Sequence, residues 1–500
     1  MNSKKAPGSI SSVVTMPDEV ELKLTLSPRH ADVLESAGLM ARTPRKTRQR
    51  SIYFDTSDHR LLQAGLSLRI RRSGRKRVQT IKAGGAPAAG LFARPEWERA
   101  VADDTPVIDD TTPIPALLGD LASGLAPVFK VNVERRAWDI NEGGAVIELV
   151  LDRGEVVAGD RRSSFCEAEL ELKSGEPAAL FALARKLDAA APVRLGIQTK
   201  AERGYALLAP AVTAFKAEPV LLNHDMTAAR AFQHVVRACL RQFRLNEDLF
   251  LTGHAPEALH QARVALRRLR SAFSIFRALV DDGVGAGLRD DLRWLAAELG
   301  EARGIDALLE RAPSGALRHH LETARQTAYV HVDATLGSPR VRGLMLDLTQ
   351  WSMSGAWLAA AAAADVRDAP ARVFAGAALD RLRRKVKKHG RNLAEADDPA
   401  RHEVRKDAKK LRYAAEFFIA LFDRKRERRR YRHFIAALEG LQDELGNLND
   451  LVTAPAVLTG LGIGDPPDAM ALLFPGSKTK LLDAAGDAHA MLIDAARFWR

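Results

Sequence analysis

The chain has 500 residues, of which 46% are hydrophobic, and this is enough to form the cores of two or more domains. The formal net charge of +12 indicates an anionic partner such as nucleic acid, a nucleotide or polyphosphate. The two cysteines, Cys166 and Cys239, are far apart in sequence, which argues against a disulfide framework and against a cysteine metal site.

Nothing in the sequence indicates secretion or a membrane span. The residues up to Pro17 lack the apolar core of a signal peptide. The most apolar run, residues 356–364, has about half of the ~20 residues that a membrane helix needs. We therefore expect a cytoplasmic protein without a membrane partner.

Residues 18–209 alternate polar and apolar side chains with a period of two, which is typical of β-strands. The predicted strands are 19–26, 51–55, 66–72, 77–82, 96–101, 131–140, 146–151 and 165–173, with a hairpin turn at 141–144. The predicted helices are 28–37, 113–121 and 177–189. Because so many antiparallel strands carry charge on one face, we expect an α+β domain built on a closed antiparallel β-barrel with flanking helices.

Two of the predicted strands place acidic residues at every second position and end in lysine. One reads Glu19-Val-Glu21-Leu-Lys23, and the other has glutamates at 167, 169 and 171 before Lys173. Alternate side chains of a strand share a face, so each segment points its carboxylates to one side. Unpaired buried charges are strongly unfavourable, so this side is either exposed to solvent or the wall of a charged cavity.

Other strands carry charges that could face the same cavity. Arg69 and Arg71 share one face of their strand, and Lys82 ends the next strand. Further charged candidates are Arg135, Asp152, Lys200 and Arg203. Carboxylates bind hard divalent ions such as Mg²⁺ or Mn²⁺, whereas arginine and lysine bind phosphate oxygens. Both sets together favour a metal–triphosphate ligand over a solvated surface.

After Pro219 the sequence becomes rich in Ala, Leu and Arg with helical spacing, through residue 500. Residues 209–223 have little regular pattern and are a plausible linker, and 356–370 is a second break. This half contains an internal repeat of basic residues. The two copies are His260-x-x-Arg263-x-x-x-Arg267-x-x-Arg270 and His402-x-x-Arg405-x-x-x-Lys409-x-x-Arg412.

Spacings of three, four and three keep the four basic side chains of each copy on one stripe of a helix. Neighbouring like charges destabilise a helix, so the pattern makes sense if a polyanion lies along the stripe. Each copy is followed by a Leu-Gly pair, Leu299-Gly300 and Leu445-Gly446. After these pairs the copies differ, because Gly304 stands where the second copy has Asp450, so the two copies need not bind equally.

The ordered charged residues of the first half resemble the CYTH family, the triphosphate tunnel metalloenzymes, over about residues 16–212. The second half resembles the CHAD domain over about 225–500, with repeats at 225–355 and 368–500. The CHAD domain is an all-α domain implicated in binding inorganic polyphosphate, here expected to contain two helical bundles. The order of the two is similar to that of bacterial CYTH–CHAD proteins that act as inorganic triphosphatases.

The resemblance implies a role for each charged position, with Mg²⁺ or Mn²⁺ as cofactor. Metal ligands are implied at Glu19, Glu21, Asp152 and two of Glu167, Glu169 and Glu171, with Glu169 the first choice. Phosphate contacts are implied for Lys23, Arg69, Arg71, Lys82, Arg135 and Lys173, with Lys200 and Arg203 as lesser candidates. Of these, Lys23, Arg69 and Lys82 are the implied catalytic residues. Polyphosphate contacts are implied for His260, Arg263, Arg267, Arg270, His402, Arg405, Lys409 and Arg412.

The implied activity is metal-dependent hydrolysis of inorganic triphosphate, and three alternatives stay open. An adenylyl cyclase or a nucleoside or thiamine triphosphatase would use the same tunnel, but we find no cluster that would contact a base or a thiazolium group. A non-enzymatic polyphosphate-binding protein, associated with granules, would depend on the helical half. RNA binding fits the same charge, although the basic stripes contain no interleaved aromatic residues for base stacking.

Overall fold

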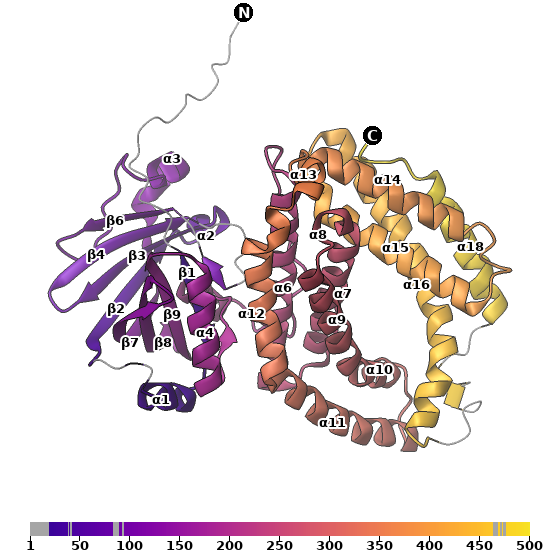
Figure 1. The fold of residues 1–500 in the computed structure, drawn as a ribbon, viewed down its shortest axis with the longest axis horizontal. Coiled ribbons are helices and arrows are strands. Elements are labelled where there is room, and N and C mark those ends of the chain that lie inside the picture. The colour runs from indigo at the N-terminus through magenta and orange to yellow at the C-terminus, as the bar shows by residue number, and fades with distance from the viewer. Residues whose placement is uncertain are drawn as a thin grey trace, which may run out of the picture. The chain divides into compact units, whose positions relative to one another are not determined.

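The computed structural model describes residues 20–38, 40, 43–83, 90–92, 95–463, 469, 470, 473 and 477–500. The chain forms two compact units, Met1–Ala211 and Val212–Arg500, which are described separately below. The first is built on a β-sheet and the second is helical (Figure 1). Within the described ranges, no helix is long and apolar enough to cross a membrane.

The first unit is an antiparallel sheet of ten strands. They are β1 (Glu21–Thr25), β2 (Arg45–Asp55), β3 (Leu66–Ser73), β4 (Lys76–Ala83), β5 (Leu91–Phe92), β6 (Glu96–Ala100), β7 (Ala126–Glu142), β8 (Ala145–Ala158), β9 (Arg161–Ser174) and β10 (Arg194–Leu195). Their order in the sheet is β10-β1-β9-β8-β7-β2-β3-β4-β6, and β5 pairs with β1. The antiparallel sheet domain predicted from the alternation is thus confirmed.

Short helices cover the apolar face of this sheet. They are α1 (Pro28–Ser36), α2 (Arg60–Gln63), α3 (Ile114–Leu118), the 3₁₀ helix η1 (Gly119–Gly124) and α4 (Ala178–Ala190). α4 packs against β1, β7 and β9, where Leu22, Leu24 and Leu170 are fully buried. α3 packs on the apolar side of β3 and β4, against Leu68 and Ile81. A further helix, α5 (Lys200–Leu208), packs against β7, β8 and β9.

The prediction of a closed barrel is wrong in one respect, because hydrogen bonds do not close the sheet in the part of the chain that the structure describes. β5 has only two residues and pairs with β1 at Leu22↔Leu91, whereas β6 pairs with β4 at Lys82↔Glu96. The two sides of the sheet are therefore linked by the short connection from β5 to β6 instead of by a ladder. The sheet nevertheless curls around a cavity that residues of seven strands line.

Two differences from the predicted elements affect this cavity. β2 begins at Arg45, six residues before the predicted start. Its first half is entirely polar and so has no alternating pattern, but the ladder with β7 holds it as a strand from Arg45↔Ala137 onward. The helix α5 was not predicted. Its start is nevertheless readable, because Thr199 and Glu202 form a capping box, a signal that the sequence contains as Thr-x-x-Glu.

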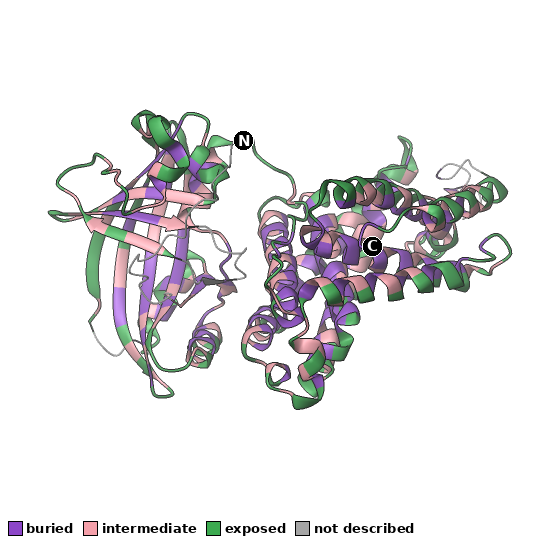
Figure 2. Cartoon of the chain, turned by 90° about the horizontal axis from the view of Figure 1, so that it is seen from above, coloured by how far each residue is buried: buried purple, intermediate pink, exposed green. Residues whose placement is uncertain are grey.

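The second unit is almost entirely helical. Its helices are α6 (Ala228–Gly253), α7 (Pro256–Ile275), α8 (Arg277–Val280), α9 (Gly283–Glu298), α10 (Gly300–Leu309), α11 (Ala316–Gly337), α12 (Pro339–Ser354), α13 (Ala364–Arg367), α14 (Ala371–His389), α15 (Asp398–Phe418), α16 (Lys425–Gly460) and α18 (Lys478–Asp494). Short 3₁₀ helices lie at Ala356–Leu358, Ala361–Ala363 and Ile419–Leu421. Figure 2 shows buried residues along the faces on which these helices pack. α7 and α15, which carry the two basic stripes, contact each other directly.

Candidate active site and polyanion site

The cavity inside the curled sheet is about 100 Å³ and is lined mostly by polar and charged side chains. Its charged lining residues are Glu21, Lys23, Arg69, Arg71, Lys82, Arg135, Glu169, Glu171 and Lys200. The strand register explains why they meet, since Lys23 lies opposite Glu169 and Glu21 lies opposite Glu171 across the β1–β9 ladder. Most of the charged residues singled out in the sheet half therefore lie around one space.

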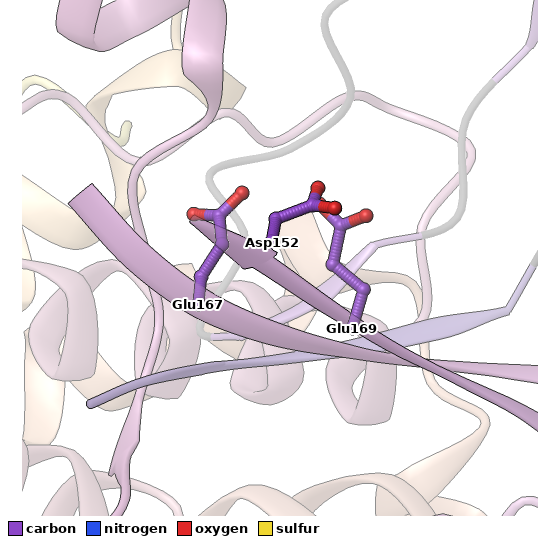
Figure 3. Close-up of side chains that lie close together, drawn as sticks. All are labelled: Asp152, Glu167 and Glu169. Atoms are coloured by element: carbon purple, nitrogen blue, oxygen red, sulfur yellow. The ribbon is translucent and has the colours of Figure 1, made fainter. Parts of the chain in front are cut away.

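Three carboxylates form a buried cluster on one wall, with oxygens within 4.8 Å of one another (Figure 3). Asp152 on β8 lies opposite Glu167 on β9, and both are fully buried, whereas Glu169 reaches the cavity. The Lys200 ammonium lies 2.8 Å from Asp152, 2.6 Å from Glu167 and 2.8 Å from Glu169. The cluster is thus compensated by a cation from α5.

Two more cations complete this network. Lys23 pairs with Glu167 at 3.0 Å and also with Glu169. Arg135 donates two hydrogen bonds to Asp152, of 2.8 and 2.6 Å, and a third to Glu169 at 2.9 Å. Such bidentate contacts are among the stronger charged hydrogen bonds. They hold the carboxylates in one arrangement without a bound ligand.

The network shifts the pKa values of its members. Burial alone would lower the pKa of Lys200, but Asp152, Glu167 and Glu169 outweigh it and raise that pKa well above its usual value. Burial would raise the pKa of Glu169, but Lys200, Lys23 and Arg135 hold it well below its usual value. Glu21 behaves differently, because burial and the neighbouring Glu169 raise its pKa to about 6.

Arg69, Arg71 and Lys82 line the side of the cavity formed by β3 and β4. Lys82 pairs with Glu96 at 2.7 Å, and Arg71 lies 3.5 Å from Glu98. Among the residues that the structure describes, no carboxylate lies within 4.0 Å of the guanidinium of Arg69, whose buried Nε has no hydrogen-bond partner. This wall therefore has cationic groups available for phosphate.

The remaining candidates lie at the edges of the site. Lys173 is 42% exposed and pairs with Glu171 at 2.5 Å and with Glu148 at 3.5 Å. Arg203 does not line the cavity and lies over the ring of Phe165, 5.8 Å from its centre. Glu19 lies outside the described residues. Its role stays a prediction.

The site also contains residues that were not among the sequence-predicted site residues. Glu96 and Glu98 compensate Lys82 and Arg71, and Glu98 accepts a hydrogen bond of 2.8 Å from Thr80. Their signal was present, because Glu96-Trp-Glu98 alternates as the first acidic strand does. Tyr53 lines the cavity and hydrogen-bonds Arg69, but a lone tyrosine in a strand gives no signal in the sequence.

An apolar cluster lies beside the buried end of the cavity. Its members project from the same faces of β2, β7, β8 and β9 as the charged residues and from α5: Tyr53, Phe129, Val131, Val133, Val156, Ala158, Phe165 and Tyr205. Tyr53 stacks on Phe129 at 4.6 Å. Because this cluster excludes water next to the carboxylates, electrostatic interactions there are stronger than at a surface.

In the helical unit the two basic stripes come together. The pKa of Lys409 on α15 is lowered to about 7 by burial, then by Arg405, Arg267 and Arg412. Arg267 belongs to the other stripe, on α7, so the two stripes contribute to one cluster of cations. The pKa of Arg263 is similarly lowered to about 10 by burial, then by Arg267 and other arginines. We use the term basic cluster for Arg263, Arg267, Arg405, Lys409 and Arg412.

The two copies of the repeat make matching contacts. In the first copy Arg303 donates a hydrogen bond of 2.9 Å to His260, and in the second His402 lies 3.1 Å from Asn449. Burial and Arg303 lower the pKa of His260 to about 4, so it is neutral at pH 7. His260 therefore accepts a hydrogen bond from Arg303, whereas His402 donates one to the side-chain oxygen of Asn449.

The ends of the stripes differ from their centre. Arg270 is exposed to solvent. Arg412 lies 3.6 Å from Glu416 and 3.7 Å from Glu439, so it is partly compensated. The structure thus places both stripes on contacting helices but concentrates their uncompensated charge at the centre.

Two family models match the chain, in the order in which the two units occur. The CYTH domain model matches residues 17–205, and the CHAD domain model matches residues 234–459. The sheet unit therefore contains a CYTH domain, and the helical unit contains a CHAD domain.

One curated relative, an inorganic triphosphatase from Haemophilus influenzae, is 31% identical over 203 residues. This match covers 38% of the present chain and 55% of the relative, so the chain spans about half of that protein's length. Among solved structures, the CHAD domain from the plant Ricinus communis is 32% identical, with 55% of this chain and 90% of that chain covered and a TM-score of 0.44. A candidate adenylyl cyclase from Hippeastrum, described as having a dominant triphosphatase activity, is 20% identical, with 38% and 95% covered and a TM-score of 0.29.

Proposed function

We propose that the CYTH domain hydrolyses inorganic triphosphate with Mg²⁺ or Mn²⁺ and that the CHAD domain binds inorganic polyphosphate. One observation carries the first part: a single cavity is lined by the carboxylates Glu21, Glu169 and Glu171 on one side and by the cations Arg69, Arg71 and Lys82 on another. The relationship to an inorganic triphosphatase supports the same reaction.

The carboxylate cluster fits a divalent cation. Asp152, Glu167 and Glu169 supply hard oxygen ligands within 4.8 Å of one another, and a divalent ion bound by all three would displace the Lys200 ammonium that now lies among them. Glu21 faces the cavity beside Glu169. One buried oxygen of Glu167, Oε2, has no hydrogen-bond partner among the described residues. When bound, a divalent ion neutralises charge on the phosphate oxygens and helps to orient the attacking water. Glu19 completes the proposed ligand set, and Glu171 lies further toward Lys173.

The cations have the complementary task of holding the phosphate chain. Arg69 lies beside Tyr53 and has no carboxylate within 4.0 Å among the described residues, since Glu96 acts on it only from farther away, so it is the foremost phosphate anchor. Lys82 and Arg71 lie beside it, and Lys23, Arg135 and Lys200 contact the carboxylates from the opposite wall. We assign Lys23, Arg69 and Lys82 to the reacting phosphates, and Lys173 and Arg203 to the edges of the site.

The lining of the cavity favours inorganic triphosphate over nucleoside or thiamine triphosphate. Tyr53 is the one aromatic residue among the described lining residues, and its ring is already stacked on Phe129. A purine or thiazolium ring would need an apolar or aromatic platform of its own. A bare phosphate chain needs only charged and polar contacts.

The basic cluster carries the proposal for the CHAD domain. Arg263, Arg267, Arg405 and Arg412 each bury a nitrogen that has no hydrogen-bond partner in the described part of the chain. Buried donors without acceptors and mutual repulsion among neighbouring cations are both unfavourable, and a polyphosphate chain relieves both. We propose that the two repeats, 225–355 and 368–500, bind one polyanion and that the protein is cytoplasmic and associates with polyphosphate granules.

Phosphate release tests the first part of the proposal. The full chain is incubated with Mg²⁺ or Mn²⁺ and with triphosphate, ATP or thiamine triphosphate. We expect fast release from triphosphate, a large loss in Arg69→Ala, and normal rates in the control Glu134→Gln, whose side chain is 60% exposed on β7. Rapid phosphate release from ATP, with none from triphosphate, would contradict the proposed activity.

Competition tests the second part. We expect long-chain polyphosphate to bind the full protein at physiological salt and to be displaced poorly by RNA. Since the stripes carry no stacking aromatics, RNA has only its phosphates to offer. Equal displacement by RNA of matched phosphate content would contradict the assignment of the stripes to polyphosphate.

A further inference from the structure

Each copy of the repeat places a glycine directly against an arginine of its basic stripe. A Cβ atom at Gly300 would lie 3.2 Å from Nη1 of Arg263, with no other atom within 4 Å outside its own helix. A Cβ atom at Gly446 would lie 2.7 Å from Nη1 of Arg405, and the next nearest atoms, at 3.6 and 3.7 Å, belong to the same guanidinium. In both copies the space of the missing side chain is taken by a stripe arginine.

The backbone does not explain these glycines. Gly300 begins α10 and Gly446 lies inside α16, and neither has the positive φ that favours glycine. Glycine inside a helix is less stable than alanine, because it loses more conformational freedom on folding. A glycine at position 446 therefore weakens α16, and the compensating gain must come from what lies against it.

In each copy, the stripe helix contacts its neighbouring helix in two places: through the arginine that lies against the glycine and through the histidine. Arg263 follows His260 by three residues, and Arg303, the partner of His260, follows Gly300 by three. In the second copy the same spacing links His402 to Arg405 and Gly446 to Asn449. Residues three apart share a helix face, so each stripe helix touches its neighbour through a histidine and an arginine laid over a glycine.

The two guanidinium groups differ in their other contacts. Arg263 donates a hydrogen bond of 2.9 Å from Nη1 to the carbonyl of Ala296. Nη1 of Arg405 is buried without a hydrogen-bond partner in the described residues, so the fit against Gly446 is what positions it. Arg405 in turn adds to the effect of burial in lowering the pKa of Lys409, and Arg267 lies close enough to Arg405 to repel it.

We propose that Gly300 and Gly446 are positioning residues of the polyphosphate site. Their missing side chains let the guanidinium groups of Arg263 and Arg405 lie against α10 and α16 and take part in the basic cluster. A planar guanidinium binds two phosphate oxygens only in a narrow range of orientations, so a small displacement weakens the contact. This inference rests on the proposed binding of polyphosphate.

The test is Gly446→Ala in the full chain, with affinity for long-chain polyphosphate and thermal unfolding both measured. Losing one charged phosphate contact weakens binding by about tenfold. The unfolding temperature should stay the same or rise, because alanine is the better helix former. The matched control is Gly440→Ala on the same helix, where a Cβ meets nothing within 4 Å. Gly300→Ala and Gly304→Ala form the corresponding pair on α10.

A double-mutant cycle separates positioning from a merely structural role. If Gly446 acts through Arg405, adding Gly446→Ala to Arg405→Ala should weaken binding no further. An equal additional loss, a lowered unfolding temperature, or unchanged affinity in Gly446→Ala while Arg405→Ala weakens binding would each overturn the inference. If Arg405→Ala also leaves binding unchanged, the proposed site itself is wrong, and the role of the glycines falls with it.

Discussion

The two domains both gather charge, but they balance it in opposite ways. In the CYTH cavity Lys23, Lys200 and Arg135 already pair with Asp152, Glu167 and Glu169. In the CHAD basic cluster Arg267, Arg405 and Arg412 lie near Lys409, and the carboxylate of Asp450 offsets only part of their effect on that lysine. One site is neutralised from within, whereas the other is left with excess positive charge.

This difference predicts different behaviour toward ligands. A neutralised site keeps its shape without a ligand, and binding there exchanges one set of charged partners for another. A site with excess charge gains stability directly from an anion, because repulsion among its cations is relieved. The lysine pKa values differ between the two sites in the same way: the pKa of Lys200 in the neutralised site is raised, and that of Lys409 in the site with excess charge is lowered to about 7.

The largest expected effect comes from breaking the balance in the CYTH cavity. Glu169→Gln removes the carboxylate that Lys23, Lys200 and Arg135 share, and an uncompensated buried charge costs about 3–5 kcal/mol. We expect triphosphate hydrolysis to fall by at least about 100-fold and the CYTH domain to unfold at lower denaturant. Polyphosphate binding should persist. Full activity would show that Glu169 has no role in metal binding or hydrolysis.

A second effect concerns metal binding and pH. Because the pKa of Glu21 is raised to about 6, its carboxyl takes up a proton as pH falls through 6 and no longer binds a cation. Below that pH the affinity for Mn²⁺ should fall about tenfold per unit. The measurement is Mn²⁺ binding by calorimetry from pH 7 to 5. Glu21→Gln should bind Mn²⁺ weakly at every pH, and an unchanged pH profile in this variant would contradict the assignment.

The next prediction sharpens the contrast with the CHAD domain. Arg267→Ala should weaken polyphosphate binding about tenfold and leave triphosphate hydrolysis unchanged. It should also raise the unfolding temperature of the CHAD domain, because Arg267 repels Arg405 and Lys409. Arg277→Ala is the control, since its side chain is 71% exposed and pairs with Asp281. A lower unfolding temperature in Arg267→Ala would show that the cluster is not under electrostatic strain.

The smallest expected effect is a change of polyphosphate affinity with pH, caused by the basic cluster. Lys409 has a pKa of about 7, so it is protonated below pH 7 and loses its charge as pH rises above 7. Polyphosphate should therefore bind a few-fold more weakly at pH 9 than at pH 7, with uptake of a fraction of a proton on binding. Calorimetry in two buffers of different ionisation enthalpy measures this uptake. Lys409→Arg should abolish it, and persistent uptake there would point to another group.

Much of this architecture could be predicted from local patterns. The strands β3, β4, β6 and β9 follow from alternation, and the basic stripes on α7 and α15 follow from spacing. The polar first half of β2 could not be predicted, because a ladder with β7 holds it in place of an apolar face. α5 was missed although its Thr199–Glu202 capping box is readable, and with it the central position of Lys200.

The sequence by itself determined which side chains share a face, because the periods of a strand and of a helix are properties of the local backbone. It therefore placed Glu167, Glu169 and Glu171 on one side of β9 without distinguishing among them. Only the tertiary structure decided that Glu167 is buried behind the cavity, that Glu169 contacts three cations, and that Glu171 lies next to Lys173. It also decided that Arg267 meets Lys409 and that glycines lie beneath two arginines. Partners of this kind depend on ladder register and helix packing between distant segments, and no local pattern encodes them.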